Sequence, residues 1–483
     1  MSLSATDWVL LSPEFFLTAA GLLLLVLATS LGKAREEFLG YLTVLALALT
    51  VVLLAVVAVN PARRAGPILA GMFVVDNFAL FFKFLILLAI VLTVLASIRF
   101  VGLAPYPGGE YYALLLFAGV GMLFMVSGSN LISIYVSLEL MALSSYILAG
   151  YFKEEVKSTE AALKYFVLGA FSSGILLYGL SLVYGVGGKM GLSELAFLYA
   201  STGRSNLVVL GILMVLAGLL FKIAAVPFHV WTPDVYEGSP TPVTAFFSVG
   251  PKLAAYAILA RIFYVAFPKF YADWGFIVSL VAAATMVWGN LAALLQSNVK
   301  RMLAYSSIAH AGYALLGVLG FRTEFGLWGV LVYLLAYTFM TFGAFALVVF
   351  LETRGYAAES VTDFDGLAKR NMPAAVTMLI FLLSLAGIPP TAGFIGKYYL
   401  FTAAMKAGYA WLAVLAVLAS AVSLFYYFRI AAAMFFSEAA GARLASSYAL
   451  TAAVAICATG TLLAGVAPER FLAILHSCVP GRY

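Results

Sequence analysis

The chain has 483 residues, of which 64% are hydrophobic and 10% are charged. Soluble domains contain roughly 45–50% apolar and about 25% charged residues, so water cannot be the solvent around most of this surface. The composition therefore excludes a set of soluble domains and predicts an all-α polytopic protein that contacts the lipid bilayer. The formal net charge of +6 is modest and spread over connections, so we expect no nucleic acid as a partner.

The sequence offers little for cofactor chemistry. The two cysteines, Cys457 and Cys478, are too few for the ligands of an iron–sulfur cluster. The three histidines, His229, His310 and His476, lack the paired spacing of haem or zinc ligands. No Gly-rich nucleotide-binding loop follows a strand. We therefore expect the chain itself to bind no cofactor or metal and to contain no redox-catalytic residue.

Apolar runs bounded by charged residues, Gly or Pro predict about fourteen membrane-spanning helices. The expected ranges are 11–32, 37–59, 74–97, 111–128, 130–151, 160–186, 206–230, 241–266, 274–296, 301–319, 327–352, 372–405, 409–435 and 447–467. The first run has no basic segment before it, so we expect a retained helix and not a signal peptide. An even number of spans puts both termini on one side, and a small excess of Lys and Arg in alternate connections favours the outer side.

Six ionisable side chains lie within these spans, where a Lys or Asp at the midplane costs ~2.5–3.5 kcal/mol. They are Glu139, Lys222, Lys252, His310, Lys397 and Arg429. This cost requires that they face one another or water. Lys222 and Arg429 could instead extend to an interface, His310 could be a neutral interior residue, and the others could form structural ion pairs.

Other polar residues are ambiguous. His229 lies beside Pro227 near a span end, where packing is an alternative to proton relay. Asp76 and Lys83 share a face of the third span, and we expect them to be helix-end groups that contact another subunit.

The spacing of the six groups indicates an internal repeat. A trio on spans 5, 7 and 8 recurs on spans 10, 12 and 13, with similar separations along the chain. Five helices per unit is an odd number, so two copies would run in opposite directions through the membrane, as in inverted-repeat transporters. We expect one membrane domain made of residues 1–105 (helices 1–3), 106–270 (helices 4–8), 271–436 (helices 9–13) and 437–483 (helix 14).

Each copy also contains an interrupted helix. Pro227 follows Lys222 by five positions, and Gly387, Pro389 and Pro390 precede Lys397. Proline removes a backbone donor and clashes with the preceding turn, which predicts discontinuous helices 7 and 12. Free carbonyls at membrane depth survive only where they are buried or line a wet cavity, so these breaks indicate a transport path.

The residue types suit proton transfer. Unlike arginine, a buried lysine can lose its proton, so Lys222, Lys252 and Lys397 are candidate proton carriers. Glu139 would modulate them, because two unit charges 8 Å apart interact by ~2 kcal/mol at an effective dielectric constant of ~20. Polar neighbours at helical spacing could connect the path. These are Tyr135 near Glu139, and Ser306, Ser307 and Tyr313 near His310.

Three stretches resemble a known family. They are FKIAAVPFHVWTPDVYEGSPTPVTAFFSVGPK (221–252), EAALKYFVLGAFSSGILLYG (160–179) and LAYSSIAHAGY (303–313). They are similar to the antiporter-like membrane subunits of respiratory complex I, above all to subunit N of bacterial NADH:quinone oxidoreductase. The resemblance covers nearly the whole chain. It implies that Glu139, Lys222, Lys252, His310 and Lys397 form the family's proton half-channels and central hydrophilic axis.

The resemblance also implies a place in an assembly. NADH, FMN, iron–sulfur clusters and quinone would belong to partner subunits, and this chain would move protons as part of that enzyme. Its partners would be subunit M, small membrane subunits and peripheral-arm subunits. It would lie in the bacterial cytoplasmic (inner) membrane with periplasmic termini. The alternatives are an Mrp-type cation/proton antiporter subunit, a membrane subunit of an energy-converting hydrogenase, and a purely structural membrane spacer.

Overall fold

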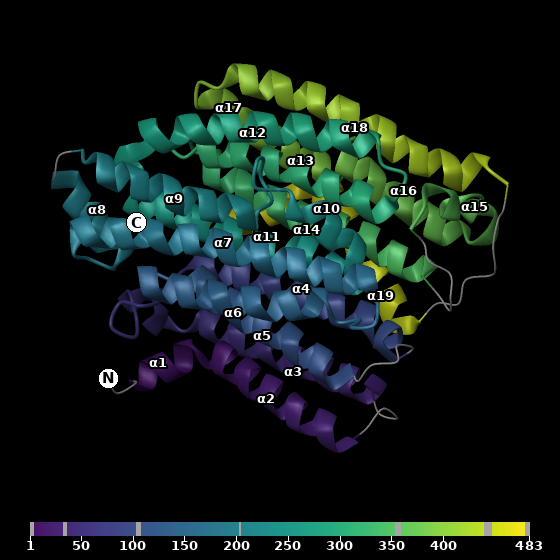
Figure 1. The fold of residues 1–483 in the computed structure, drawn as a ribbon, viewed down its shortest axis with the longest axis horizontal. Coiled ribbons are helices and arrows are strands. Elements are labelled where there is room, and N and C mark those ends of the chain that lie inside the picture. The colour runs from purple at the N-terminus through teal and green to yellow at the C-terminus, as the bar shows by residue number, and fades with distance from the viewer. Residues whose placement is uncertain are drawn as a thin grey trace.

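The computed structural model describes residues 4–31, 36–102, 108–201, 204–352, 359–438 and 447–478. Within these ranges the regular secondary structure is helical, apart from isolated β-bridges. The helices run roughly parallel or antiparallel across the view in Figure 1, with α1 to α3 along one edge and α17 and α18 along the other. The expected all-α membrane fold is confirmed.

Among the described residues, twelve helices are long and apolar enough to cross a membrane. They are α2 (Ser12–Leu31), α3 (Glu36–Val59), α4 (Asn77–Gly102), α5 (Gly108–Ser127), α6 (Leu131–Ala149), α7 (Val156–Gly187), α11 (Thr241–Arg261), α12 (Tyr271–Leu294), α13 (Val299–Leu319), α14 (Gly326–Leu351), α18 (Ala410–Phe436) and α19 (Tyr448–Val466). Two shorter apolar helices, α9 (Asn206–Lys222) and α16 (Met372–Ala386), are each continued after a break by α10 (Trp231–Gly238) and α17 (Ala392–Lys406). These helices follow the expected spans, except that α10 lies beyond the range 206–230 expected for span 7. Both expected breaks are present.

Short helices outside the expected spans cover parts of the ends and connections. They are α1 (Ala5–Leu10), α8 (Leu192–Ser201), α15 (Leu367–Arg370) and α20 (Pro468–His476). Leu69 N donates to the Asp7 carboxylate at 3.1 Å, and Asn77 donates to the Ser477 carbonyl at 2.8 Å. The two described ends of the chain therefore lie at the same end of the helix bundle as the connection before α4. Five of the Lys and Arg residues in the connections lie outside the described residues, namely Lys33, Arg35, Arg354, Arg443 and Arg482.

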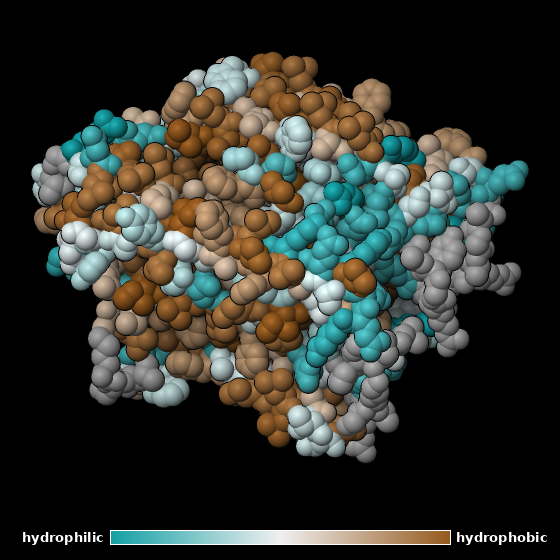
Figure 2. Space-filling model, viewed as in Figure 1, coloured by the Kyte–Doolittle hydropathy of each residue, from teal (hydrophilic) through white to brown (hydrophobic). Residues whose placement is uncertain are grey.

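Burial divides the helices into a centre and a periphery. The most apolar windows of α11 and α14 are fully buried and that of α13 is 94% buried, whereas those of α2 and α3 are 22% and 33% buried. Apolar side chains cover most of the face in Figure 2, as expected for a surface in contact with lipid. The ionisable groups of α11 and α13 are thus placed at the centre of the bundle.

The N-terminal helices are attached to this centre by buried ion pairs. Lys83 on α4 lies 2.5 Å from Glu14 on α2, and both side chains are fully buried. Asp76, just before α4, accepts two hydrogen bonds of 2.9 and 3.0 Å from Arg261 on α11. Asp76 lies at a helix end as expected, since it accepts a hydrogen bond from Ala79 N at the start of α4. For Lys83 the expectation of a helix-end group that contacts another subunit is wrong, because Lys83 lies within α4 and is fully buried against Glu14.

Candidate functional site

The first break places Lys222 at the end of a helix. Lys222 is the last residue of α9, and the indole nitrogen of Trp231 on α10 donates to the carbonyl of its neighbour Phe221 at 3.2 Å. The last carbonyls of a helix have no intrahelical donor and carry the negative end of the helix dipole. An ammonium group is favoured there, so the break creates a site for the Lys222 charge at membrane depth.

Lys222 and Glu139 form the first pair of the site. Lys222 is 4% exposed, and its Nζ atom lies 3.4 Å from the Tyr146 hydroxyl. Glu139 on α6 is half-buried, accepts a hydrogen bond from Ser173 on α7, and interacts electrostatically with Lys222. Tyr135, one turn before Glu139, is also half-buried beside it. The carboxylate is therefore close enough to influence the Lys222 charge.

The second break holds Lys397 in a comparable way. Lys397 is 4% exposed, and its Nζ atom donates to the carbonyls of Leu385 and Ala386, at the end of α16, at 2.9 and 3.0 Å. A third bond of 2.8 Å goes to the Ser420 hydroxyl on α18. Although Lys397 follows its break and Lys222 precedes its own, both ammonium groups lie at the carboxyl end of the first half-helix.

Gly387 makes the second break possible. Its φ angle is +85°, a conformation that side chains with a Cβ atom rarely adopt. A Cβ atom on Gly387 would lie 2.9 Å from Cδ of Lys397. The glycine thus both ends α16 and leaves room for the lysine stem to pass.

Lys252 lies at the centre of the bundle. It is on α11, one residue after Pro251, and is 2% exposed. Its Nζ atom donates to the Ser307 carbonyl at 2.8 Å and to the Ser307 hydroxyl at 2.5 Å. The Ser307 hydroxyl is in turn 2.9 Å from the Tyr337 hydroxyl on α14. This contact joins helix 8 of the first expected repeat to helix 10 of the second.

His310 continues the polar centre one turn further along α13. Its Nδ1 atom hydrogen-bonds to the Tyr333 hydroxyl, and its Nε2 atom lies 3.2 Å from the Tyr427 hydroxyl. Ser306 also hydrogen-bonds to Tyr427. His310 is thus held on both ring nitrogens by hydroxyl groups, which can accept or donate a proton.

Tyr313 completes the connection to the second break. Its ring centroid is 5.7 Å from that of His310 and 4.9 Å from the Nζ atom of Lys397. Its hydroxyl accepts a hydrogen bond of 3.1 Å from Asn290 on α12. Lys252, His310 and Lys397 are therefore joined by a continuous series of hydroxyl and ring contacts.

Between the two lysines of the first repeat, the contacts are aromatic. The Tyr146 ring lies 4.8 Å from the Tyr165 ring, and Tyr165 lies 5.5 Å from Phe247, which is on the same helix as Lys252. The five expected site residues thus lie along one zone of the bundle, in which Glu139 is half-buried and the other four are buried. Polar and ring contacts connect Lys252, His310 and Lys397.

The expected auxiliary residues differ in position. Ser306 and Tyr313 belong to the polar centre, and Tyr135 borders Glu139. His229 is half-buried in the first break, with its ring 6.1 Å from that of Trp288. Arg429 is exposed and donates to the carbonyls of Leu294 and Gln296 at the end of α12. Arg429 therefore lies at the periphery and not among the central groups.

Several polar partners were missed from the sequence. They are Tyr146, Ser173, Tyr333, Tyr337, Ser420 and Tyr427. Because the chain has 27 tyrosines, the presence of a tyrosine in a span did not identify it as a hydrogen-bond partner of a site residue. A search for hydroxyl residues on the faces of spans 5, 6, 11 and 13 could have narrowed the choice. Within the described parts of the chain, no group of three or more His, Cys, Asp or Glu residues could hold a metal ion.

Comparison with known proteins assigns the family. NADH-quinone oxidoreductase subunit N of Trichlorobacter lovleyi is 43% identical over 473 residues, which cover 97% of this chain and 96% of that protein. Subunit N 1 of Koribacter versatilis is 45% identical over 488 residues, with 98% and 96% coverage. The chain belongs to the subunit N family of NADH-quinone oxidoreductases. The broader family described as "NADH:quinone oxidoreductase/Mrp antiporter, TM" matches residues 128–423.

Chains of two solved membrane complexes share this fold. A chain in respiratory complex I from Thermus thermophilus with bound aureothin is 35% identical, with a TM-score of 0.81 over 96% of this chain and 99% of that chain. A chain of the Mrp complex from Dietzia sp. has a TM-score of 0.83 at 26% identity, with 99% and 97% coverage. The fold is therefore shared by chains of complex I and of an Mrp complex. The region matched by the broader family contains all five central residues.

Proposed function

We propose that this chain is the proton-translocating subunit N of an NADH:quinone oxidoreductase, and that protons move through Glu139, Lys222, Lys252, His310 and Lys397. One observation carries the proposal. The hydrogen-bond acceptors of the three lysines are hydroxyl and carbonyl oxygens. A lysine held only by neutral groups can release its proton and remain hydrogen-bonded, whereas a lysine in a tight ion pair would leave an unpaired buried carboxylate.

Lys83 provides the internal contrast. It is as deeply buried as the three lysines, but the Glu14 carboxylate lies 2.5 Å from its Nζ atom. That arrangement is typical of a structural ion pair. The same chain therefore contains both kinds of buried lysine, and the three in the central zone are the kind that suits proton transfer.

The energy for transport would come from partner subunits. NADH, FMN, iron–sulfur clusters and quinone would be bound there, and the chain itself would perform no redox step. Moving one charge against 100 mV takes ~2.3 kcal/mol, so a coupled reaction is required. The partners would be subunit M, small membrane subunits and the peripheral-arm subunits, in the bacterial cytoplasmic membrane, with the termini of this chain in the periplasm.

The proposed proton pathway consists of two half-channels, one in each unit of the internal repeat. We assign residues 106–270 and 271–436 to two inverted units, flanked by 1–105 and 437–483. The two breaks at matching helices, each with a lysine at the end of its first half-helix, support this division. Each unit would provide one half-channel, and the contact of Lys252 with Ser307 would join them.

Subunit N is favoured over an Mrp-type antiporter because the identity to curated subunit N relatives is 43–45%, against 26% to the Mrp chain. The proposal is tested with complexes that contain Lys222→Ala or Lys252→Ala, reconstituted in proteoliposomes. Assembled complexes should transport fewer protons per electron or turn over slowly. Wild-type rates and ratios in both variants would support a structural spacer instead.

A further inference from the structure

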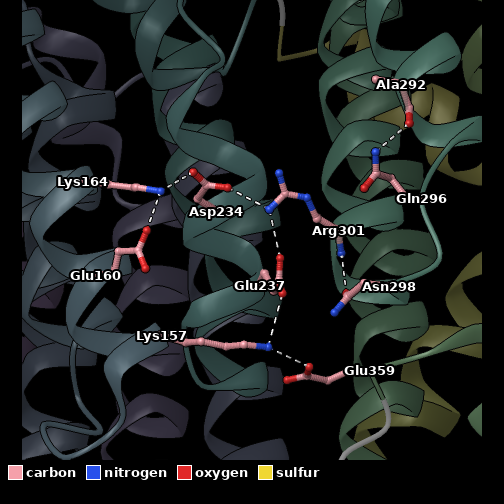
Figure 3. Close-up of polar contacts among 10 residues, drawn as sticks. All are labelled: Lys157, Glu160, Lys164, Asp234, Glu237, Ala292, Gln296, Asn298, Arg301 and Glu359. Carbon is pink, nitrogen blue, oxygen red and sulfur yellow. Dashed lines mark hydrogen bonds and ion pairs between the residues drawn. The ribbon is translucent and has the colours of Figure 1, made fainter.

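The short helix α10 follows the first break and is held by side chains of two long helices. In Figure 3, its acidic residues Asp234 and Glu237 lie between lysines of α7 on one side and Arg301 of α13 on the other. The helix α10 has eight residues, and helices of this length are not stable on their own. Its position therefore depends on these contacts, which come from the first proposed unit through α7 and from the second through α13.

The two carboxylates of α10 each bind a cation on both sides. Asp234 and Glu237 are three positions apart, so they lie on one face of the helix. The Nη1 atom of Arg301 donates to both carboxylates, at 2.7 and 2.9 Å. On α7, Lys164 lies 2.6 Å from Asp234, and Lys157 lies 3.4 Å from Glu237. Each carboxylate thus joins a lysine of the first unit to the same arginine of the second.

Aromatic contacts between α7 and α10 continue this network into the interior. Tyr165 directly follows Lys164 on α7, and its ring stacks on that of Trp231 with centroids 4.5 Å apart and 9° between the planes. Both aromatic residues are 3% exposed. Trp231 precedes Asp234 by three positions, so the stacked rings and the ion pair of Lys164 hold the same turn of α10 against α7.

The two stacked rings border the Lys222 site. The indole nitrogen of Trp231 donates to the Phe221 carbonyl at 3.2 Å, at the end of α9 where Lys222 lies. The ring of Tyr165 lies 4.8 Å from that of Tyr146, whose hydroxyl is 3.4 Å from Nζ of Lys222. Protein interiors are close-packed, so a displacement of α10 would shift the groups around the Lys222 ammonium.

The helix α13 contacts the other proposed proton carrier of the first unit as well. Arg301 is the third residue of α13, and Ser307, six positions later, accepts the hydrogen bonds of Lys252. Rigid helices and packed side chains carry energetic coupling between sites. One helix of the second unit therefore contacts Lys252 directly and the Lys222 site through α10.

We propose that Arg301 is a positioning residue that holds α10 in place through Asp234 and Glu237. In that position, Trp231 fixes the end of α9 at which the Lys222 charge lies. The second unit thereby sets the geometry of a proton-carrying site in the first unit. Arg301 acts through α10 and not by contact with Lys222. This inference rests on the proposed function of Lys222.

NADH-driven proton transport by the assembled complex in proteoliposomes tests this role. Arg301→Ala should lower the rate by about fivefold, a factor that fits the loss of one partly exposed ion-pair network. Arg301→Lys should keep most of the rate, because an ammonium nitrogen can donate to both carboxylates as Nη1 does. Asp234→Asn removes the charge on the other side of the same ion pair and should reproduce the loss, which covers the case that Arg301→Ala does not assemble.

A double variant separates positioning from general stabilisation. Trp231→Phe keeps an aromatic ring beside Tyr165 but loses the donor to the Phe221 carbonyl, so it should also lower the rate severalfold. If Arg301 acts through Trp231, the combination of Arg301→Ala with Trp231→Phe should be no slower than the slower single variant. Losses that multiply in the combination, or a wild-type rate in Arg301→Ala and Asp234→Asn, would overturn the proposal.

Arg204→Ala is the matched control. Arg204 also forms an ion pair between the two proposed units, with Asp273, but it lies before the start of α9, whereas Lys222 is at the other end of that helix. Arg204→Ala should retain the wild-type rate, and a loss equal to that of Arg301→Ala would contradict a specific role of Arg301.

Lys222→Ala is measured in parallel to separate the two proposals. If Lys222→Ala is impaired and Arg301→Ala is not, only the positioning role is wrong. A fully active Lys222→Ala complex contradicts the proposed function of Lys222 itself.

Discussion

The Nζ atom of Lys252 donates hydrogen bonds to both oxygen atoms of Ser307, the carbonyl at 2.8 Å and the hydroxyl at 2.5 Å. The contact crosses from α11 to α13 and so connects the two proposed inverted units. Since both acceptors are neutral, the lysine can lose its charge without leaving a buried carboxylate exposed to an apolar environment. This relationship explains how one residue can be both a structural contact between the units and a proton carrier.

Ser307→Ala tests that contact. The substitution removes the hydroxyl acceptor and the contact with Tyr337 but keeps the Ser307 carbonyl. We expect proton transport to fall by about tenfold, and stability to fall by only about 1 kcal/mol for the lost hydrogen bond. Transport in proteoliposomes and thermal unfolding of the purified complex measure the two effects.

Ser279→Ala is the control for Ser307→Ala. Ser279 is equally buried, but its hydroxyl donates within its own helix to the Phe276 carbonyl at 2.7 Å. Transport should stay at the wild-type level in this variant. Equal rates in Ser307→Ala and Ser279→Ala would contradict a role for the Ser307 hydroxyl.

Ser420 provides the same test at the second break. Ser420→Ala removes one of three acceptors of the Lys397 ammonium and leaves the carbonyls of Leu385 and Ala386 in place. We expect a severalfold loss of proton transport with normal assembly. Ser423→Ala, one turn along the same helix, loses only a bond to the Ser420 carbonyl and should be unaffected. A loss of the same size in both variants would show that general packing of α18 is responsible.

Gly387→Ala separates backbone strain from crowding of Lys397. Its φ angle of +85° makes an alanine strained by about 1–2 kcal/mol, and the new Cβ atom would also lie 2.9 Å from the lysine stem. Gly408→Ala is strained similarly at φ +88°, but its Cβ atom would meet nothing within 4 Å. We therefore expect both variants to lower the unfolding temperature and only Gly387→Ala to impair transport. Impaired transport in both would assign the effect to strain alone.

Much of this architecture could be predicted from the sequence. Apolar runs of sufficient length specify the spans, and Pro227, Pro389 and Pro390 mark the two breaks because proline cannot continue a helix without losing a bond. Because a charged side chain is costly in lipid, the occurrence of Glu139, Lys222, Lys252, His310 and Lys397 within the spans marks them as candidate functional residues. These properties are local in sequence, so no knowledge of tertiary contacts was required.

The partners of these residues could not be predicted, because they depend on how distant helices pack. Glu14 lies two positions inside α2, and nothing in the sequence indicated that it would neutralise Lys83. Arg429 has a spacing that suits a repeat, yet its helix turns it toward the surface. Tyr333 contacts His310 from the next helix and Tyr427 contacts it from 117 residues along the chain, and each is one of many tyrosines.

The buried pair of Glu14 and Lys83 predicts a purely structural response. Lys83→Met leaves the Glu14 carboxylate buried without its partner and should lower the free energy of unfolding by about 3–5 kcal/mol. The double substitution Glu14→Leu with Lys83→Met should recover most of that loss, since it removes both charges. Thermal unfolding of the detergent-solubilised complex measures the difference. No recovery in the double variant would mean that the pair has a role beyond mutual neutralisation.

The most direct test of the central claim compares a lysine held by neutral groups with a lysine held in an ion pair. The number of protons transported per electron is measured in proteoliposomes for the Lys252→Met complex and for the complex with Glu14→Leu and Lys83→Met. We predict that Lys252→Met transports fewer protons per electron or turns over far more slowly, while the double variant behaves as the wild type. Wild-type turnover and stoichiometry in an assembled Lys252→Met complex would contradict the assignment of Lys252 as a proton carrier.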